Sequence, residues 1–184
     1  MMARLLAALA LLLTAGCNPL LPDPNGHDTG YRLILEKAVT IPPGHTRVHL
    51  QNGRITGTTF DSYQPSCSLE VRDLAEEPQT VAPDTFIVHH IQHFFEEVAA
   101  RIWHRQQLAG LALAGADVDA GPSDIFEGWH FWLHSERQPR VLRLTCRGIF
   151  AEPWEARPPT FEEIATALGP VARLTKPGIT SGEF

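Results

Sequence analysis

The sequence predicts a mainly β domain, an antiparallel β-sandwich or open barrel with one helix near its C-terminal end, at the margin of the α+β class. Short stretches rich in aliphatic and aromatic residues recur at close spacing, and turn residues separate them, as in antiparallel folds. A single late segment carries helix start and stop signals. The chain has 184 residues, 43% hydrophobic and 20% charged, which is the composition of one globular domain.

The first part of the domain is predicted to contain a hairpin between two further strands. Residues 31–39 are rich in aliphatic side chains and form the first strand. Residues 45–50 and 54–60 pair as a hairpin, because Asn52-Gly53 suits a type I′ turn in which both positions take positive φ. Residues 66–74 alternate between the two faces and form the next strand.

The segment from Thr85 to about residue 92 is predicted to be a strand, because Phe, Ile and Val dominate it. A helix starting at Asp84 is the alternative. Five apolar residues fit helical spacing: Ile87, Ile91, Phe94, Phe95 and Val98. Neither pattern decides the structure beyond this point. Residues 99–124 fit a short helix or a mobile excursion, and their apolar run is too short to cross a bilayer.

The C-terminal part is predicted to hold two paired strands, at 128–135 and 140–149, followed by a helix. Thr160 is the expected N-cap of this helix, and Glu163 completes a capping box. Gly169-Pro170 ends it, since Gly accepts the conformation that closes a helix and Pro cannot continue one. Three residues form its apolar face: Phe161, Ile164 and Leu168.

The first 17 residues resemble the signal peptide and lipobox of bacterial lipoproteins. Arg4 supplies the positive region, and the apolar run at 5–13 is too short for a transmembrane helix. Leu13-Thr14-Ala15-Gly16-Cys17 resembles the lipobox itself. The resemblance implies that residues 1–16 are removed as a signal peptide and that a diacylglycerol, with a further acyl chain on the amine, is attached to Cys17.

A lipid anchor of this kind predicts that the protein is located at a membrane of the bacterial envelope. Each buried acyl CH₂ contributes about 0.8 kcal/mol, and two or three chains hold a protein stably. Asn18 follows the cysteine where an aspartate would signal inner-membrane retention, so resemblance to enterobacterial sorting favours the outer membrane, with the domain facing the periplasm. The lipidated cysteine and a flexible tether occupy 17–30, the single domain 31–176 and a tail 177–184.

The remaining two cysteines, Cys67 and Cys146, are expected to form one disulfide between two strands, because the compartment is oxidising. The bond would close a loop of about 80 residues, for which chain entropy predicts a stabilisation near 4 kcal/mol. A pair of free thiols and a metal site shared with histidine are the alternatives.

Charge and motifs exclude several functions. The net charge is −6 and the sequence has no run of Lys or Arg, so a nucleic-acid partner is excluded. Gly-x-Ser-x-Gly, His-Glu-x-x-His, Cys-x-x-Cys and P-loop motifs are all absent from the sequence. We therefore expect no enzyme, assign no catalytic residue and expect no cofactor.

Histidine is the one unusual concentration, with nine residues. His89 and His93 would share one face of a strand, as would His130 and His134. Two such pairs on adjacent strands would offer four imidazoles to Zn²⁺ or Cu²⁺. Ordinary packing of histidine beside Trp and Phe is the preferred interpretation. The sequence also has four tryptophans: Trp103, Trp129, Trp132 and Trp154. The preferred interpretation is that they are core residues. The alternative is that they line a ligand cleft or a partner surface.

Three stretches resemble small uncharacterised lipoproteins of proteobacteria: 60–72, which includes Phe60-Asp61, Tyr63 and Cys67; 144–146; and 163–169. The resemblance covers most of 31–174 and implies no activity. The sequence thus predicts a non-enzymatic binding or scaffolding lipoprotein, with the membrane and an envelope protein as its partners. A metal-binding envelope protein is the second candidate, and an envelope hydrolase is the third.

Overall fold

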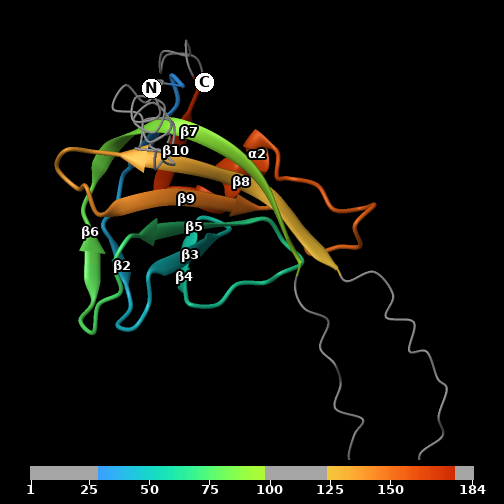
Figure 1. Ribbon diagram of the computed structural model, residues 1–184, viewed down its shortest axis with the longest axis horizontal. Helices are drawn as coiled ribbons and strands as arrows, with labels where there is room; N and C mark the ends of the chain where they lie inside the picture. The colour runs from blue at the N-terminus through green and yellow to red at the C-terminus, as the bar shows by residue number, and fades with distance from the viewer. Residues whose placement is uncertain (1–28, 98–123, 177–184) are drawn as a thin grey trace, which may run out of the picture.

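The computed structural model describes residues 29–97 and 124–176 (Figure 1). These described residues form an antiparallel sheet of eight strands that curls into a half-barrel, a second sheet of two strands and one helix. The bounds are β1 (Arg32–Leu35), β2 (Val39–Ile41), β3 (Arg47–Gln51), β4 (Arg54–Gly57), β5 (Ser66–Val71), β6 (Gln79–Val81), β7 (Asp84–Glu97), β8 (Ile125–His134), β9 (Val141–Arg147), α2 (Phe161–Leu168) and β10 (Ala172–Thr175).

The strand order in the large sheet is β10-β1-β7-β8-β9-β5-β3-β4, while β2 and β6 pair separately. The prediction of a mainly β fold with one C-terminal helix is confirmed, and the sheet is an open barrel. Short antiparallel strands joined by tight turns produce this curl because each neighbouring pair adds to the right-handed twist.

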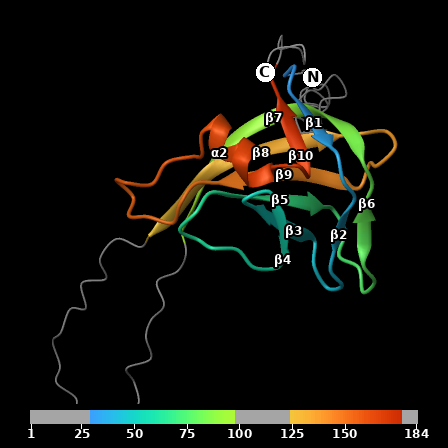
Figure 2. The same cartoon turned by 180° about the vertical axis from the view of Figure 1, so that it is seen from behind.

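One face of the half-barrel, which we call the inner face, encloses the hydrophobic core. The helix α2 contacts β3, β5 and β10 there, with Ile164, Ala167 and Leu168 buried. In Figure 2, α2 and the strands β1 and β10 lie in front of β7 and β8. Four large inward side chains from neighbouring strands are almost fully buried: Phe86, Leu133, Leu144 and Leu69. We call the opposite face of β3, β5, β8 and β9 the outer face.

The predicted hairpin is confirmed as β3 and β4, although both strands are shorter than expected. Asn52 has φ 52° and Gly53 has φ 70°, as the type I′ turn requires. The turn also packs on the end of α2, where Gly53 N donates to Ala167 O at 3.1 Å. A Cβ at Gly169 would lie 2.4 Å from the Gly53 Cα, so this contact needs glycine.

The ambiguous segment after Asp84 is a strand of 14 residues, β7, and it continues to Glu97. It pairs with β8 along most of its length, which provides the backbone hydrogen bonds that a helix would otherwise supply. Asp84 is no helix cap: its buried carboxylate accepts from Ser135 Oγ at 2.7 Å. The segment predicted as a short helix or mobile excursion, 99–124, lies outside the described residues except for its last residue.

The single first strand predicted at 31–39 is wrong. The chain forms β1 and β2 instead, and between them the amides of Glu36 and Lys37 both donate to Val171 O. Two short strands, β6 and β10, were not predicted. They have three and four residues, too few for a periodic pattern to stand out.

The capping box of α2 is confirmed. Thr160 Oγ1 accepts from Glu163 N at 3.2 Å, and the Glu163 carboxylate accepts from Thr160 N at 2.8 Å. The same carboxylate pairs with Arg157 at 2.6 Å, and this hydrogen bond lowers the pKa of Glu163 to about 2. Gly169 ends the helix.

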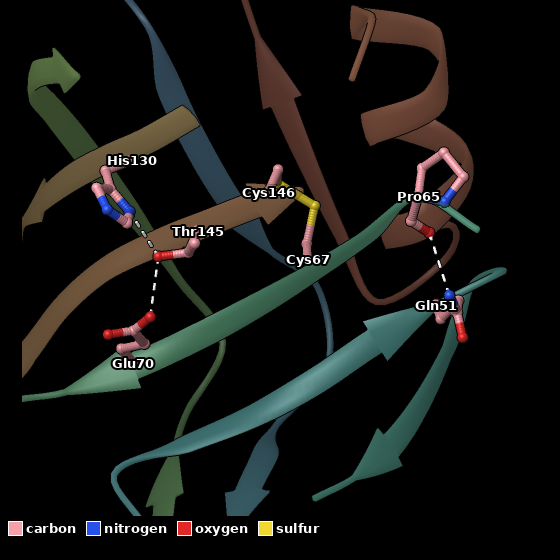
Figure 3. The surroundings of a disulfide bond; sticks show 7 residues. All are labelled: Gln51, Pro65, Cys67, Glu70, His130, Thr145 and Cys146. Carbon is pink, nitrogen blue, oxygen red and sulfur yellow. Dashed lines mark hydrogen bonds between the residues drawn. A yellow bond between two sulfur atoms is a disulfide. The ribbon is translucent and has the colours of Figure 1, made fainter. Parts of the chain in front are cut away.

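The predicted disulfide joins Cys67 on β5 to Cys146 on β9, which are register partners (Figure 3). Their Cα atoms are 4.0 Å apart, and both residues are 1% exposed. The bond therefore ties two paired strands on the inner face. Free thiols and a cysteine metal site are excluded as alternatives for this pair.

Candidate functional site

The outer face carries polar side chains in three cross-strand rows, which the register of β3, β5, β8 and β9 defines. We call this set the polar face. The first row is Trp132, Arg143, Glu70 and Arg47; the second is His130, Thr145, Ser68 and His49; the third is Gly128, Arg147 and Ser66.

A chain of hydrogen bonds crosses three strands within the polar face (Figure 3). Thr145 Oγ1 donates to Glu70 Oε1 at 2.9 Å and lies 2.9 Å from His130 Nδ1. Since the only hydroxyl proton of Thr145 is directed at Glu70, His130 Nδ1–H must donate to Thr145. Arg143 Nε donates to Glu70 Oε2 at 3.0 Å. The chain leaves the lone pair of the neutral imidazole on Nε2.

Aromatic rings fix the imidazole of His130. The Phe94 ring stacks on it with centroids 4.1 Å apart and planes 9° apart, and Trp132 meets it edge-on at 6.3 Å. Gly128 makes room for this stack, because a Cβ there would lie 2.7 Å from the Phe94 ring. Arg143 covers Trp132, with its guanidinium carbon 5.1 Å from the ring centroid. A glycine within a strand of large residues was the sequence signal for this close packing.

Two histidines of the polar face have strongly lowered pKa values. Burial, followed by the positive charge of Arg143, lowers the pKa of His130 to about 4. Burial, followed by the charges of Arg147 and Arg47, lowers the pKa of His49 to about 4. Both imidazoles are therefore neutral at pH 7, so the polar face offers hydrogen bonds from these rings and positive charge from arginine only.

The hydroxyl groups of this network are poorly placed for nucleophilic attack. Thr145 and Ser68 are both 0% exposed, so a substrate carbonyl has no path to them. A catalytic hydroxyl gives its proton to a histidine base, whereas Thr145 gives its proton to Glu70. The arrangement suits binding and the fixing of side-chain positions.

The structure does not bring the four predicted metal histidines together. His93 pairs with Trp129 on β8, and His130 is the next residue along that strand, so His93 and His130 lie on opposite faces. His93 Nε2 is 3.3 Å from Glu127 Oε2. His134 lies near enough to His89 for its positive charge to lower the pKa of His89, after the larger effect of burial.

A β-bulge explains this separation. The register of β7 against β8 shifts between Val88 and His90, and the alternation of faces assumed for His89 and His93 breaks there. In the part of the chain that the structure describes, no group of three or more His, Cys, Asp or Glu side chains is placed to hold a metal ion.

A groove of about 280 Å³ opens on the inner side, between the sheet and α2. Its lining is mostly aromatic and aliphatic, with one cation: Tyr31, Ile91, Trp129, Phe131, Pro159, Phe161, Ile164 and Lys176. Lys176 Nζ lies 4.5 Å from the Phe161 ring centroid. Apolar walls with one placed charge are typical of small-molecule sites. Of the three tryptophans that the structure describes, only Trp129 lines this groove.

The other tryptophans have different surroundings. Trp132 Nε1 donates to Gln92 at 3.2 Å on the outer face, and Trp154 is 68% exposed. Trp103 lies outside the described residues. Sequence analysis missed Lys176 and Phe161 as groove residues, since neither is near Trp129 in the chain and only the fold brings them together.

A wider cleft of about 460 Å³ lies between segments 71–81 and 137–141. Several of its polar side chains already have partners: Arg140 bonds Asp73 and Gln79, and Gln138 bonds the backbone of Ala82. This cleft is therefore a weaker candidate than the groove.

The lowered pKa values of His49 and His130 predict a loss of stability in mild acid. The unfolded chain binds protons near the ordinary value of 6.5 and the folded chain only near 4, so unfolding takes up protons between these values. Urea titrations should show a free energy of unfolding that is flat above pH 6.5. As the pH falls towards 4, it should decrease by up to about 1.4 kcal/mol per pH unit for each histidine.

The variants His130→Gln and His49→Gln test the source of this dependence. We expect each variant to remove about half of the slope that the two rings produce together. Glu163 acts in a separate window, because a carboxyl with a lowered pKa loses its stabilisation only below its ordinary value of 4.5. A free energy of unfolding that stayed constant from pH 6.5 to 4.5 would refute this account of the His49 and His130 rings.

In the described ranges, no helix is both long enough and apolar enough to cross a membrane. Comparisons with protein-family models, with curated proteins and with solved structures find no match. The lipoprotein resemblance therefore stays a prediction, and the candidate sites are the groove on the inner face and the polar face.

Proposed function

We propose that the chain is a non-enzymatic, lipid-anchored binding module of the bacterial envelope that holds a small amphiphilic carboxylate in the inner groove. The observation that carries this proposal is the groove itself: aromatic and aliphatic walls, with the ammonium group of Lys176 as the one charge. An apolar body would lie against Trp129 and Phe131, and an acidic group would meet Lys176.

The chemistry of the groove supports this choice of ligand. Trp129 and Phe131 follow the core side of β8, so their rings are fixed by the sheet and lose little freedom on binding. Among the described residues, no carboxylate pairs with Lys176. Its ammonium group makes a cation–π contact with the Phe161 ring. An apolar acid would satisfy both features at once.

The position of the groove relative to the proposed anchor also supports an amphiphile. Tyr31 lines the groove and follows directly after the predicted tether at 17–30. A lipid on Cys17 would thus keep the groove within a short tether of the membrane, where acyl compounds are concentrated. Palmitate labelling of the full chain, present in the wild type and lost in Cys17→Ser, tests the anchor.

The alternative functions have less support. A hydrolase would need an accessible nucleophile, and Thr145 and Ser68, beside the two neutral imidazoles, are fully buried. A metal site would need the histidine pairs to meet, and His93 and His130 lie on opposite faces. A binding role needs neither of these conditions.

Calorimetric titration of the full-length Cys17→Ser protein with decanoate tests the groove. We expect saturable binding that Ile91→Asp abolishes, because a carboxylate in the apolar lining would have to be desolvated and would repel the ligand. Ile87→Asp is the matched control, since Ile87 lies on the same strand, is 38% exposed and does not line the groove.

Decanol separates the two parts of the proposal. Decanol should bind more weakly than decanoate to the wild type, and Lys176→Gln should remove that difference while decanol binding stays the same. An absence of saturable decanoate binding, or equal losses in Ile91→Asp and Ile87→Asp, would overturn the groove as the binding site.

A further inference from the structure

The C-terminal half of β7 has a hydrogen-bonding edge that no described strand covers. On one side β8 pairs with β7 as far as Glu97, but on the other side β1 pairs only with residues 84–87. The last backbone contact on that side is at Val88, whose carbonyl accepts from Thr29 N at 3.3 Å. Residues 90–97 therefore direct alternate N–H and C=O groups away from β8, and no backbone group in the described part of the chain pairs with them.

This edge has few of the features that usually protect an edge from pairing. The two outermost strands of the large sheet, β4 and β10, have only four residues each, which limits what can pair with them. Longer edges in natural proteins are commonly protected by lysine, by proline or by a covering element. Residues 90–97 contain neither lysine nor proline, and Phe95 among them is 68% exposed. The edge is thus a template for one further strand.

An antiparallel copy of the same strand is complementary to this edge. In a two-fold pair with His93 on the axis, residues at equal distances before and after His93 lie opposite each other. The register of β7 places 90 and 96 on the outer face, and 91 and 95 on the inner face. His90 then meets Glu96, and Ile91 meets Phe95, each pair occurring twice. Opposite polar and apolar pairs of this kind stabilise a ladder.

The groups of the polar pair are available for a partner. Glu96 Oε2 accepts from Arg147 Nη2 at 3.3 Å, which leaves Oε1 for another donor, and the Glu96 side chain is 53% exposed. His90 is exposed, and its imidazole makes no hydrogen bond to any residue that the structure describes. An imidazole N–H can donate to a carboxylate whether the ring is neutral or charged.

The neighbouring two-fold registers fit less well. An axis one residue before His93 would need the edge at Val88, which Thr29 already occupies. An axis one residue after His93 would place the carboxylate of Glu97 opposite the apolar Ile91, with no compensating charge. Complementarity therefore selects the register centred on His93.

We propose that the chain forms a two-fold symmetric dimer in which residues 90–96 of β7 pair, antiparallel, with the same residues of a second copy. The pairing satisfies backbone N–H and C=O groups on both edges and covers the exposed ring of Phe95 with Ile91 of the copy. The two large sheets join through their β7 strands. This interface is independent of the proposed amphiphile and of the proposed lipid anchor.

Cross-linking of single-cysteine variants tests the register, on the full-length Cys17→Ser protein whose other two cysteines form the buried disulfide. Residue 93 lies opposite itself in the proposed pair, with Cβ atoms about 5 Å apart, which a small shift brings within reach of a disulfide. His93→Cys should therefore form a covalent dimer on mild oxidation. Gln92→Cys is the matched control, because the two copies of residue 92 are diagonal neighbours about 7 Å apart and should cross-link about tenfold more slowly.

Sedimentation equilibrium of the Cys17→Ser protein measures the dimer itself. We expect a reversible monomer–dimer equilibrium, with a dissociation constant about tenfold higher in Phe95→Lys, because symmetry places a lysine opposite Ile91 at two points. Leu74→Lys is the matched control, since Leu74 is 66% exposed and lies outside β7, and it should leave the dissociation constant unchanged. Thermal melts show that each variant is folded.

Three results would each overturn the proposal. The first is a monomer at every concentration up to the millimolar range. The second is cross-linking of Gln92→Cys at least as fast as that of His93→Cys. The third is a dimer that Phe95→Lys weakens no more than Leu74→Lys does, which would place the contact on another surface.

Discussion

Replacing Cys67 and Cys146 together with alanine should lower the free energy of unfolding by about 4 kcal/mol. The two residues are 79 positions apart, so the bond removes a large amount of conformational freedom from the unfolded chain. Both sulfurs are also buried in the core, so the alanines lose apolar contacts in the folded state. Urea unfolding at pH 7 measures the change as a shift of the midpoint.

The wild-type protein unfolded in a reducing agent provides the control for this result. Reduction removes the cross-link but keeps both sulfur atoms in the core, so it isolates the contribution of the unfolded chain. We expect reduction to account for most of the loss. If reduction left the unfolding midpoint unchanged, the bond would contribute nothing to stability.

Replacing Glu70 with glutamine should cost about 3 kcal/mol, because breaking one partner out of a buried ion pair leaves the other charge uncompensated. The Glu70 side chain is 5% exposed and accepts from both Arg143 and Thr145. Glutamine keeps the shape but can accept through only one oxygen. Urea unfolding of Glu70→Gln, Arg143→Met and the double variant measures the coupling between the pair.

Asp73→Asn is the matched control for Glu70→Gln. Asp73 pairs with Arg140 at 3.2 Å, and both side chains are 61% exposed. Solvent screens such a pair, so we expect a change below about 0.5 kcal/mol. Equal costs for Glu70→Gln and Asp73→Asn would mean that the buried network adds no more stability than a surface ion pair.

Local signals in the sequence were sufficient for some elements and insufficient for others. The β3–β4 turn and the cap of α2 were predictable, because Asn52-Gly53 and Thr160 act through bonds to residues a few positions away. The length of β7 was not, because its last residues are stabilised by pairing with β8, which lies about 30 residues further along the chain. The short strand β10 depends in the same way on β1.

The candidate sites show the same division. Trp129 was recognisable as a residue that could line a cleft, but its partner Lys176 comes from the end of the domain. The rows of the polar face require the register of four strands, which no single stretch encodes. The histidine pairs illustrate the opposite error: one extra residue between Val88 and His90 moves every later side chain of β7 to the other face.

The position of β1 has a mechanical consequence. This strand is the first that the structure describes, and it lies between β7 and β10, antiparallel to both. A tension applied to the chain ahead of Tyr31 would pull β1 along its own axis, across two ladders of hydrogen bonds that run perpendicular to it. Those bonds would have to shear together instead of opening one at a time. A domain pulled by its N-terminal end would thus resist unfolding at the strand to which the force is applied.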